Sequence, residues 1–284
     1  MKFVSTSLTF ACASARHRVL AANRLTLHAL EWGTPGDPGL LFLHGGSAHA
    51  HWFDPVAVAF ADRFHIIALD QRGHGESQWP DPPAYNTRDF SDDLLHVLDA
   101  LGWEDMTLVA HSMGGHNAMA FAGWHSERVH RLVIADARPA VPLERLAEYQ
   151  AKIRGRPLRT YESAEGAVAR FRLVPPETVA DPALLHHLAR AGLIERDGRW
   201  VFRFDPACDG TRQPVDAWPL LSRITAPTLV VRGECSTILR SHVAAEMVRQ
   251  IPNARLEEIP GTYHHVMLDR PAAFVSVLNR FLPG

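Results

Sequence analysis

Cysteine is scarce in this chain of 284 residues, where it occurs only at positions 12, 208 and 235. Three cysteines at no metal-ligand spacing argue against a disulfide framework and fit a reducing compartment. An excess of charge of one sign is also missing, because 29 Lys and Arg stand against 31 Asp and Glu. The net charge of −2 favours neither nucleic acid nor an anionic membrane as a partner. No apolar run reaches the length of a membrane span.

The first residues of the chain faintly resemble a signal peptide that ends in small residues. Their apolar stretch is interrupted by hydroxyl side chains at Ser5, Thr6, Ser7 and Thr9. We therefore interpret this segment as an N-terminal extension and expect a cytoplasmic protein.

Short apolar runs rich in β-branched residues alternate with helical patterns along most of the chain. This alternation predicts an α/β fold with a mostly parallel, doubly wound sheet that is covered on both faces. The predicted strands are Leu25–Trp32, Leu40–His44, His65–Asp70, Thr107–His111, Arg131–Asp136, Thr228–Arg232 and Arg255–Ile259. The predicted helices of the same core are Asp89–Leu101, Met113–Trp124, Ala244–Gln250 and Ala272–Phe281.

Residues 138–221 break the alternation, because they carry many prolines and only helical fragments such as Leu143–Ile153 and Pro182–Ala191. We interpret them as a mainly helical cap inserted between two strands of a core formed by residues 1–137 and 222–284. An insertion at the C-terminal edge of an open sheet lies over the ligand crevice, so this cap is expected to act as a lid. The alternative is a separate domain with a function of its own.

A motif with chemical meaning stands where a predicted strand meets a predicted helix, at Ala110-His111-Ser112-Met113-Gly114. A sharp turn at this point would project the Ser112 hydroxyl above the sheet, next to the N–H groups of a helix N-terminus. The small residues Ala110 and Gly114 would let the strand and helix backbones approach each other. The alternative for this pentapeptide alone is an ordinary helix cap.

Three further segments accompany this motif in chain order: Leu41-Phe42-Leu43-His44-Gly45-Gly46, the run from Asp70 to Ser77 (DQRGHGES), and Pro260-Gly261-Thr262-Tyr263-His264-His265 followed by Asp269-Arg270-Pro271. With them the chain resembles the α/β-hydrolase fold superfamily, and in particular its serine esterases and lipases, from about Val19 to Leu282. The resemblance implies that Ser112 is a nucleophile, and it is specific for the fold rather than for a substrate.

Two adjacent histidines compete for the role of general base. By the register of the family's histidine loop, the base stands three residues after Gly261 and seven before Pro271, which selects His264. His265 is then expected to pack or to support the site. The family usually has a small residue where this chain has Tyr263, so the loop differs at that position.

The third member of the triad has no carboxylate at its usual place, because Thr237 stands where a similar subgroup has Asp. Asp136, at the end of a predicted strand, is the acid we predict, since some members of the family take their acid from this strand. Glu234 is the competing carboxylate, and its position is too close to the end of the predicted strand for this role. The structural alternative for Asp136 is a buried cap of the turn before Pro139.

The resemblance also places an oxyanion hole at the backbone N–H groups of Gly46 and Met113. His44 is expected to be structural. The pair His49 and His51 could suggest a metal, but we find no carboxylate or cysteine at ligand spacing and expect substrate or rim contact instead. We therefore predict no metal and no cofactor.

The expected function is hydrolysis of a carboxylic ester, a lactone or a related acyl bond of a small molecule through an acyl-Ser112 intermediate. Cofactor-free dioxygenation on the same fold, with His264 deprotonating the substrate, is one alternative, and a non-enzymatic binder of small ligands is another. A serine at the elbow disfavours the epoxide hydrolases and haloalkane dehalogenases, which use a carboxylate nucleophile. The sequence carries no signal for an oligomeric state.

Overall fold

The computed structural model describes residues 15–282 except residues 154 and 156. The N-terminal extension expected from the sequence, with Cys12, lies outside the described residues. The strands are β1 (Arg16–Ala22), β2 (Leu25–Trp32), β3 (Gly39–Leu43), β4 (His65–Leu69), β5 (Met106–His111), β6 (Val129–Ala135), β7 (Leu193–Arg196), β8 (Arg199–Phe202), β9 (Thr228–Gly233) and β10 (Ala254–Ile259). The α-helices are α1 (Asp54–Ala57), α2 (Thr87–Leu101), α3 (Met113–Trp124), α4 (Leu143–Ile153), α5 (Ala164–Val168), α6 (Pro182–Ala191), α7 (Pro206–Thr211), α8 (Trp218–Leu221), α9 (Ser241–Gln250), α10 (Val266–Asp269) and α11 (Pro271–Phe281). Short 3₁₀ turns are η1 (Ala50–Phe53), η2 (Val58–Phe60) and η3 (Ser126–Arg128).

The central sheet has eight strands in the order β1-β2-β4-β3-β5-β6-β9-β10. The run from β4 to β10 is parallel, whereas β1 and β2 are antiparallel to their neighbours. The prediction of a mostly parallel sheet is confirmed. Strand β1 was not among the predicted strands, because its charged beginning and exposed residues lack the apolar pattern of a buried strand.

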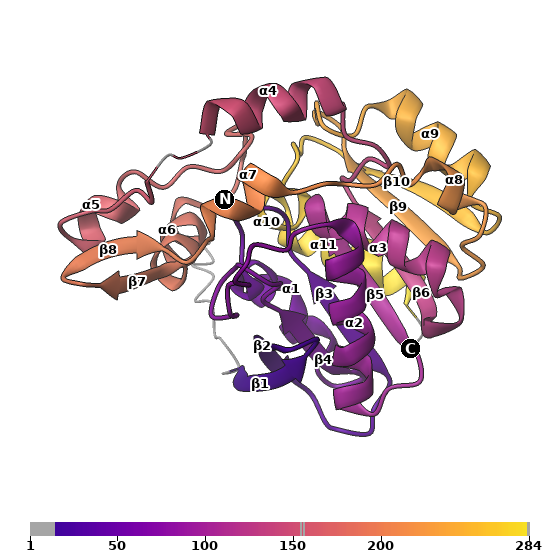
Figure 1. The fold of residues 1–284 in the computed structure, drawn as a ribbon. Coiled ribbons are helices and arrows are strands. Elements are labelled where there is room, and N and C mark those ends of the chain that lie inside the picture. The colour runs from indigo at the N-terminus through magenta and orange to yellow at the C-terminus, as the bar shows by residue number, and fades with distance from the viewer. Residues whose placement is uncertain (1–14, 154, 156, 283–284) are drawn as a thin grey trace, which may run out of the picture.

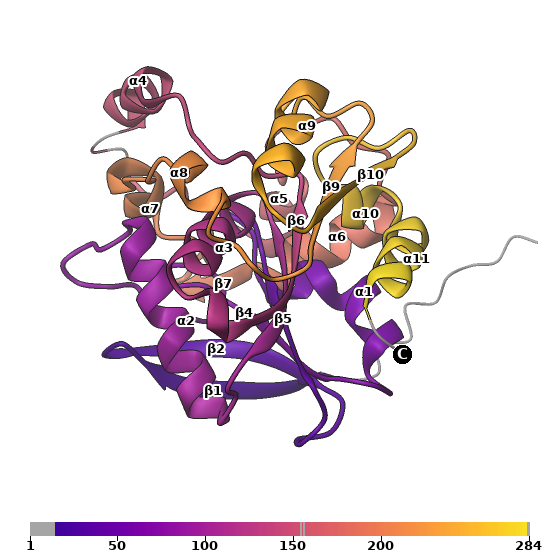
Figure 2. The ribbon, with the colours of Figure 1, turned by 90° about the vertical axis from the view of Figure 1, so that its right-hand side faces the viewer.

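Helices cover both faces of this sheet, and each face has its own apolar core. On one face the buried residues come from α2, α3 and α9, and on the other from η1, α1, α10 and α11. The strands between them are almost fully buried, as the continuous apolar runs of parallel strands require. Figure 2 shows α2 and α3 on one side of the strands and α1 and α11 on the other.

Residues 138–221 lie between β6 and β9 and have secondary structure of their own; they are called the insertion below. The insertion carries α4, α5, α6, α7 and α8, and also the antiparallel pair β7–β8, which the sequence reading missed. In Figure 1, α5, α6, β7 and β8 lie together to the left of the sheet and α4 runs across the top. The turn of the hairpin is Asp197-Gly198, with both residues at positive φ, 51° and 72°.

The insertion is fastened to the core at several points. Its two ends meet, because the amide of Ala217 donates to the carbonyl oxygen of Pro139 over 3.0 Å. The Tyr85 hydroxyl of the core donates to Asp205 of the insertion, and the Asp205 amide donates to Gly73 O at 2.8 Å. These bonds hold the segment before α7 against the loop after β4. In the part of the chain described here, no helix has both the length and the apolar character needed to cross a membrane.

Candidate active site

Ser112 lies at the turn between β5 and α3, in a backbone conformation that side chains rarely adopt. Its φ and ψ are 53° and −115°, and its amide donates to Ala135 O of the neighbouring strand at 3.1 Å. Such strain persists only where the surrounding structure imposes it. The half-buried Ser112 side chain therefore stands at the C-terminal edge of the sheet, at the start of a helix.

Close packing of α3 on the strand ends explains the two glycines that follow Met113. A Cβ on Gly114 would lie 2.6 Å from His44 O, and one on Gly115 would lie 2.6 Å from the Ala137 side chain. Neither contact can be relieved without moving the elbow, because the first is to backbone and the second to a short buried side chain. Glycine at both positions thus lets α3 begin directly beneath Ser112.

The His264 imidazole lies between Ser112 and Asp136. Its Nε2 is 2.9 Å from Ser112 Oγ, and its Nδ1 is 2.9 Å from Asp136 Oδ1. Since a carboxylate only accepts, the ring proton belongs on Nδ1, and Nε2 keeps the lone pair that receives the hydroxyl proton. Burial lowers the pKa of His264 well below its ordinary value, and the neighbouring His265 and Arg138 lower it further. The ring is therefore neutral and able to accept a proton at neutral pH.

Asp136 is fully buried directly after β6, at a positive φ of 46°. Burial raises the pKa of its carboxyl to about 7, while the donors Ser236 and Gly233 act in the opposite direction. Oδ1 accepts from Ser236 Oγ at 2.6 Å as well as from His264, and Oδ2 accepts from the Gly233 amide at 2.9 Å. Three donors converge on the two oxygens, and they stabilise the ionised form against the effect of burial.

Glu234, the competing carboxylate, lies elsewhere in the loop after β9. It is exposed, and its Oε2 accepts from the amide of Gly261 at 2.8 Å. Thus Glu234 tethers the beginning of the histidine loop, whereas the carboxylate on His264 Nδ1 is that of Asp136. Ser236, which holds Asp136, was not recognised from the sequence, because a serine in a loop carries no distinguishing pattern.

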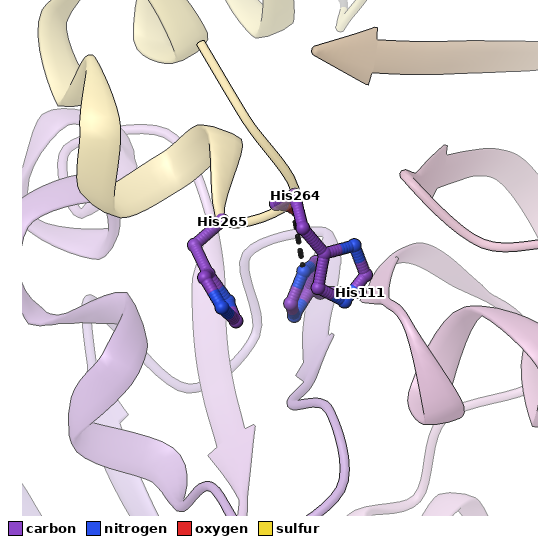
Figure 3. A group of neighbouring side chains, drawn as sticks. All are labelled: His111, His264 and His265. Carbon is purple, nitrogen blue, oxygen red and sulfur yellow. Dashed lines mark hydrogen bonds between the residues drawn. The ribbon is translucent and has the colours of Figure 1, made fainter. Parts of the chain in front are cut away.

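His264 belongs to a group of three neighbouring imidazoles with His111 and His265 (Figure 3). The Nε2 of His111 is 3.0 Å from the His264 carbonyl oxygen and donates to it, and Nε2 of His265 donates to Pro175 O at 3.0 Å. Burial lowers the pKa of His111 well below the ordinary value, and burial also lowers that of His265. His265 therefore binds the insertion, as expected for a supporting residue rather than for the one facing Ser112.

The loop after β3 brings Gly46 next to the N-terminus of α3. A Cβ on Gly46 would lie 3.9 Å from the Met113 sulfur. Among the described residues, neither the Gly46 amide nor the Met113 amide donates to a backbone carbonyl outside a helix or strand. His44 fixes the loop, because its Nδ1 donates to Gly45 O at 2.7 Å and its Nε2 accepts from the Gln71 amide at 3.0 Å.

Comparison with known proteins agrees with this geometry. A family model described as alpha/beta hydrolase fold matches residues 38–175. Over 262 residues the chain is 28% identical to a 2-(acetamidomethylene)succinate hydrolase of Mesorhizobium japonicum, which covers 91% of this chain and 92% of the relative. It is 29% identical over 265 residues to an esterase of Mycobacterium tuberculosis, covering 90% of this chain and 86% of that protein. A solved structure of E-2-(acetamidomethylene)succinate hydrolase superposes with a TM-score of 0.83 at 27% identity, covering 94% of this chain and 99% of that one.

The chain belongs to the α/β-hydrolase fold superfamily. Because several of its relatives are named hydrolases and esterases, the chain is an enzyme of the hydrolase type. In an α/β-hydrolase the loops at the C-terminal ends of the strands carry the site. Here Ser112 follows β5, Asp136 follows β6 and His264 follows β10.

One expectation at the rim of this α/β-hydrolase was wrong. A carboxylate does stand near the pair His49 and His51, because His51 Nδ1 lies 2.9 Å from Asp54 Oδ2. The spacing of three residues is that of one helical turn, which the sequence reading overlooked. His49 faces elsewhere, with its Nε2 donating to Leu188 O at 3.1 Å.

Proposed function

We propose that this enzyme is a serine hydrolase that cleaves a carboxylic ester, a lactone or a related acyl bond of a small molecule through an acyl-Ser112 intermediate. The observation that supports it most is the continuous chain from Ser112 Oγ through the His264 ring to Asp136, with both contacts at 2.9 Å. A nucleophile, a base and a group that orients the base are what acyl transfer requires.

In the first half of the proposed reaction, Ser112 Oγ attacks the carbonyl carbon while His264 Nε2 takes the hydroxyl proton. The carbonyl π bond becomes an oxyanion, which accepts hydrogen bonds from the amides of Gly46 and Met113. When the oxyanion re-forms the carbonyl, the bond to the leaving group breaks. His264 gives its proton to that group, and an acyl ester remains on Ser112.

In the second half, water repeats the attack on the acyl carbon. His264 accepts one proton of the water, the same two amides hold the oxyanion, and the Ser112 oxygen leaves with the proton from His264. The products are a carboxylic acid and free Ser112. In its ionised form Asp136 orients the imidazole through Nδ1–H and stabilises its transient positive charge, without itself taking the proton.

We also propose that the insertion of residues 138–221 acts as the cap over this site. His265, next to the base, donates to Pro175 O of the insertion, so the histidine loop and the insertion are in direct contact. Substrate selection then depends on the insertion, while the reacting side chains stand on the core.

The decisive experiment is labelling with a fluorophosphonate probe, followed by mapping of the modified residue and turnover of p-nitrophenyl acetate and butyrate. The substrate panel includes 2-(acetamidomethylene)succinate, after the name of the Mesorhizobium relative. We expect the label on Ser112, and a loss of turnover in Ser112→Ala approaching the ~10⁶-fold seen when a triad nucleophile is removed. Ser276→Ala is the matched control, because this exposed serine of α11 only donates to Ala272 O within its own helix.

Two results would contradict the proposal. One is ester turnover by Ser112→Ala at the rate of the unmodified enzyme. The other is substrate-dependent oxygen uptake that survives the same substitution, since this would indicate dioxygenation with His264 as the base and no acyl-enzyme.

A further inference from the structure

Away from the proposed triad, three side chains from two parts of the chain meet on one carboxylate. His51 lies in η1 and Asp54 begins α1, both in the core, whereas His187 lies on α6 of the insertion. His51 Nδ1 is 2.9 Å and His187 Nε2 is 2.8 Å from the same oxygen, Asp54 Oδ2. The two imidazole rings stand edge to face, with centroids 5.8 Å apart.

The carboxylate at the centre of this cluster, that of Asp54, has one oxygen that can still accept a partner. Asp54 is only 7% exposed, and its other oxygen, Oδ1, is buried without a hydrogen-bond partner in the described structure. Burial acts to raise the pKa of Asp54, but the hydrogen bonds from His187 and His51 outweigh it and leave the pKa below its ordinary value. The carboxylate can therefore take a further partner beside the two imidazoles.

We propose that His51, Asp54 and His187 form a binding site for one divalent transition-metal ion, which joins helix α6 of the insertion to the core. Two imidazoles and one carboxylate suit Zn²⁺ and ions of similar preference, whereas Mg²⁺ and Ca²⁺ favour sites built from oxygen alone. Nothing in this proposal depends on the hydrolase mechanism.

The distances fit such an ion after a small adjustment. The three ligand atoms lie within 4.8 Å of one another. Zinc binds such ligands at about 2.0–2.2 Å, so neighbouring donors of a tetrahedral site stand about 3.3 Å apart. Each imidazole would have to withdraw from Asp54 Oδ2 by roughly half an ångström to admit the ion. The side chains of His51 and His187 are 25% and 42% exposed, which leaves an open side for entry and for water as a further ligand.

Two other groups of potential ligands are less suited. In the group His17, His28 and Glu76, both ring nitrogens of His28 are engaged, one with Asp70 at 2.7 Å and the other with His17 at 2.9 Å. In the group of Figure 3, His264 is engaged on both nitrogens by Asp136 and Ser112. His51 and His187 differ from these residues. Each contacts Asp54 through one ring nitrogen, and the same nitrogen would bind the ion.

The consequence would be a reinforced attachment of α6. Without an ion, the polar contacts that hold this helix here are the one from His187 to Asp54 and the one from His49 Nε2, which donates to Leu188 O. An ion bound only in the folded state raises the melting temperature by mass action. Because one ligand comes from the insertion and two come from the core, this rise in melting temperature requires that the insertion and the core be in contact.

The test uses the full chain, first treated with EDTA and then titrated with ZnCl₂ by calorimetry and by thermal unfolding. We expect one equivalent of Zn²⁺ to bind in the micromolar range or tighter and to raise the melting temperature. MgCl₂ should do neither. Substitution with CoCl₂ should give visible absorption bands that report nitrogen and oxygen ligands around the cobalt ion.

The variant His187→Ala removes the ligand of the insertion and should weaken the binding of this equivalent by at least about tenfold, the least that loss of even a supporting group costs a metal site. His186→Ala is the matched control, because this exposed neighbour on α6 is outside the cluster. His51→Ala, on the core side, should reproduce the loss of Zn²⁺ binding and of the melting shift.

Unchanged Zn²⁺ binding in both His187→Ala and His51→Ala overturns the proposal. So does the lack of a stoichiometric Zn²⁺ equivalent in the unmodified protein, since the cluster is then only a hydrogen-bonded tether. The shift in melting temperature and the absorption bands of bound cobalt test the metal site without any measurement of enzymatic activity.

Discussion

The carbonyl oxygen of His264 accepts a hydrogen bond from Nε2 of His111, 3.0 Å away. His111 immediately precedes Ser112, so this bond joins the backbone of the histidine loop directly to the end of β5. Because burial lowers the pKa of His111 well below its ordinary value, the ring carries a single proton, and the acceptor places it on Nε2. The distance between the proposed base and nucleophile thus depends on a residue that takes no part in the chemistry.

We expect His111→Leu to lower kcat by about five- to tenfold, because a neutral hydrogen bond contributes about 1 kcal/mol. KM should change little, since the residue is buried beneath the loop. His111→Gln keeps an N–H donor of similar reach and should recover part of the loss. Steady-state kinetics of both variants checks this, and equal losses in the two would contradict a role for the donor.

Asp136→Asn should leave the fold intact and lower kcat by up to the ~10⁴-fold recorded for the same change in another triad. The amide would present an N–H group to His264 and favour the wrong tautomer. Glu234→Gln is the matched control and should be close to neutral, because the glutamine oxygen can still accept from the Gly261 amide. A large loss in Glu234→Gln alone would reassign the acid.

His264→Ala should abolish turnover, whereas His265→Ala should keep most of it. The first substitution removes the group 2.9 Å from Ser112 Oγ, and the second removes a donor to Pro175 O. Activity assays with p-nitrophenyl esters distinguish them. Greater damage from His265→Ala would show that Tyr263 shifts the register of the loop.

Stability should fall as the pH is lowered from about 6.5 to about 4. Burial lowers the pKa of several histidines from 6.5, to about 3 for His44 and to about 4 for His49, His74 and His116. Between these values the unfolded chain binds protons that the folded chain excludes, so unfolding is favoured as the pH falls. Each group contributes up to about 1.4 kcal/mol per pH unit.

Urea unfolding at a series of pH values measures this slope. His74→Asn removes one buried imidazole and should flatten the pH dependence by about one proton, even where it lowers stability overall. His96→Asn alters an exposed histidine of α2 and should leave the slope unchanged. Equal slopes in the three proteins would show that the buried imidazoles do not drive acid unfolding.

The core of the fold could be predicted because its signals are local. Helices α3, α4 and α6 have the bounds expected from periodicity, and β2 begins and ends at the predicted residues. The choice of Asp136 over Glu234 was harder, since it depends on which strand end faces the histidine loop. The pairing of β6 with both β5 and β9 sets that arrangement. The sequence of one segment alone does not predict which strands will be its neighbours in the sheet.

The features that the sequence did not predict depend on weaker or longer-range signals. The β7–β8 hairpin does carry an Asp-Gly turn, which favours tight hairpins, but its strands are only four residues each. The approach of His187 to Asp54 joins residues far apart in sequence, and nothing in either segment predicts it. Tertiary contacts between the insertion and the core decide both the cluster and the surroundings of Ser112.

The hydrogen bond from the Ala217 amide to Pro139 O brings the two ends of the insertion together. The chain therefore leaves the sheet after β6 and returns toward β9 through neighbouring points. The three proposed catalytic residues all lie outside the insertion, so a change of sequence within it replaces none of them. If the insertion is the cap proposed above, variation confined to one continuous stretch of the gene can change substrate selection while Ser112, Asp136 and His264 stay in place on the core.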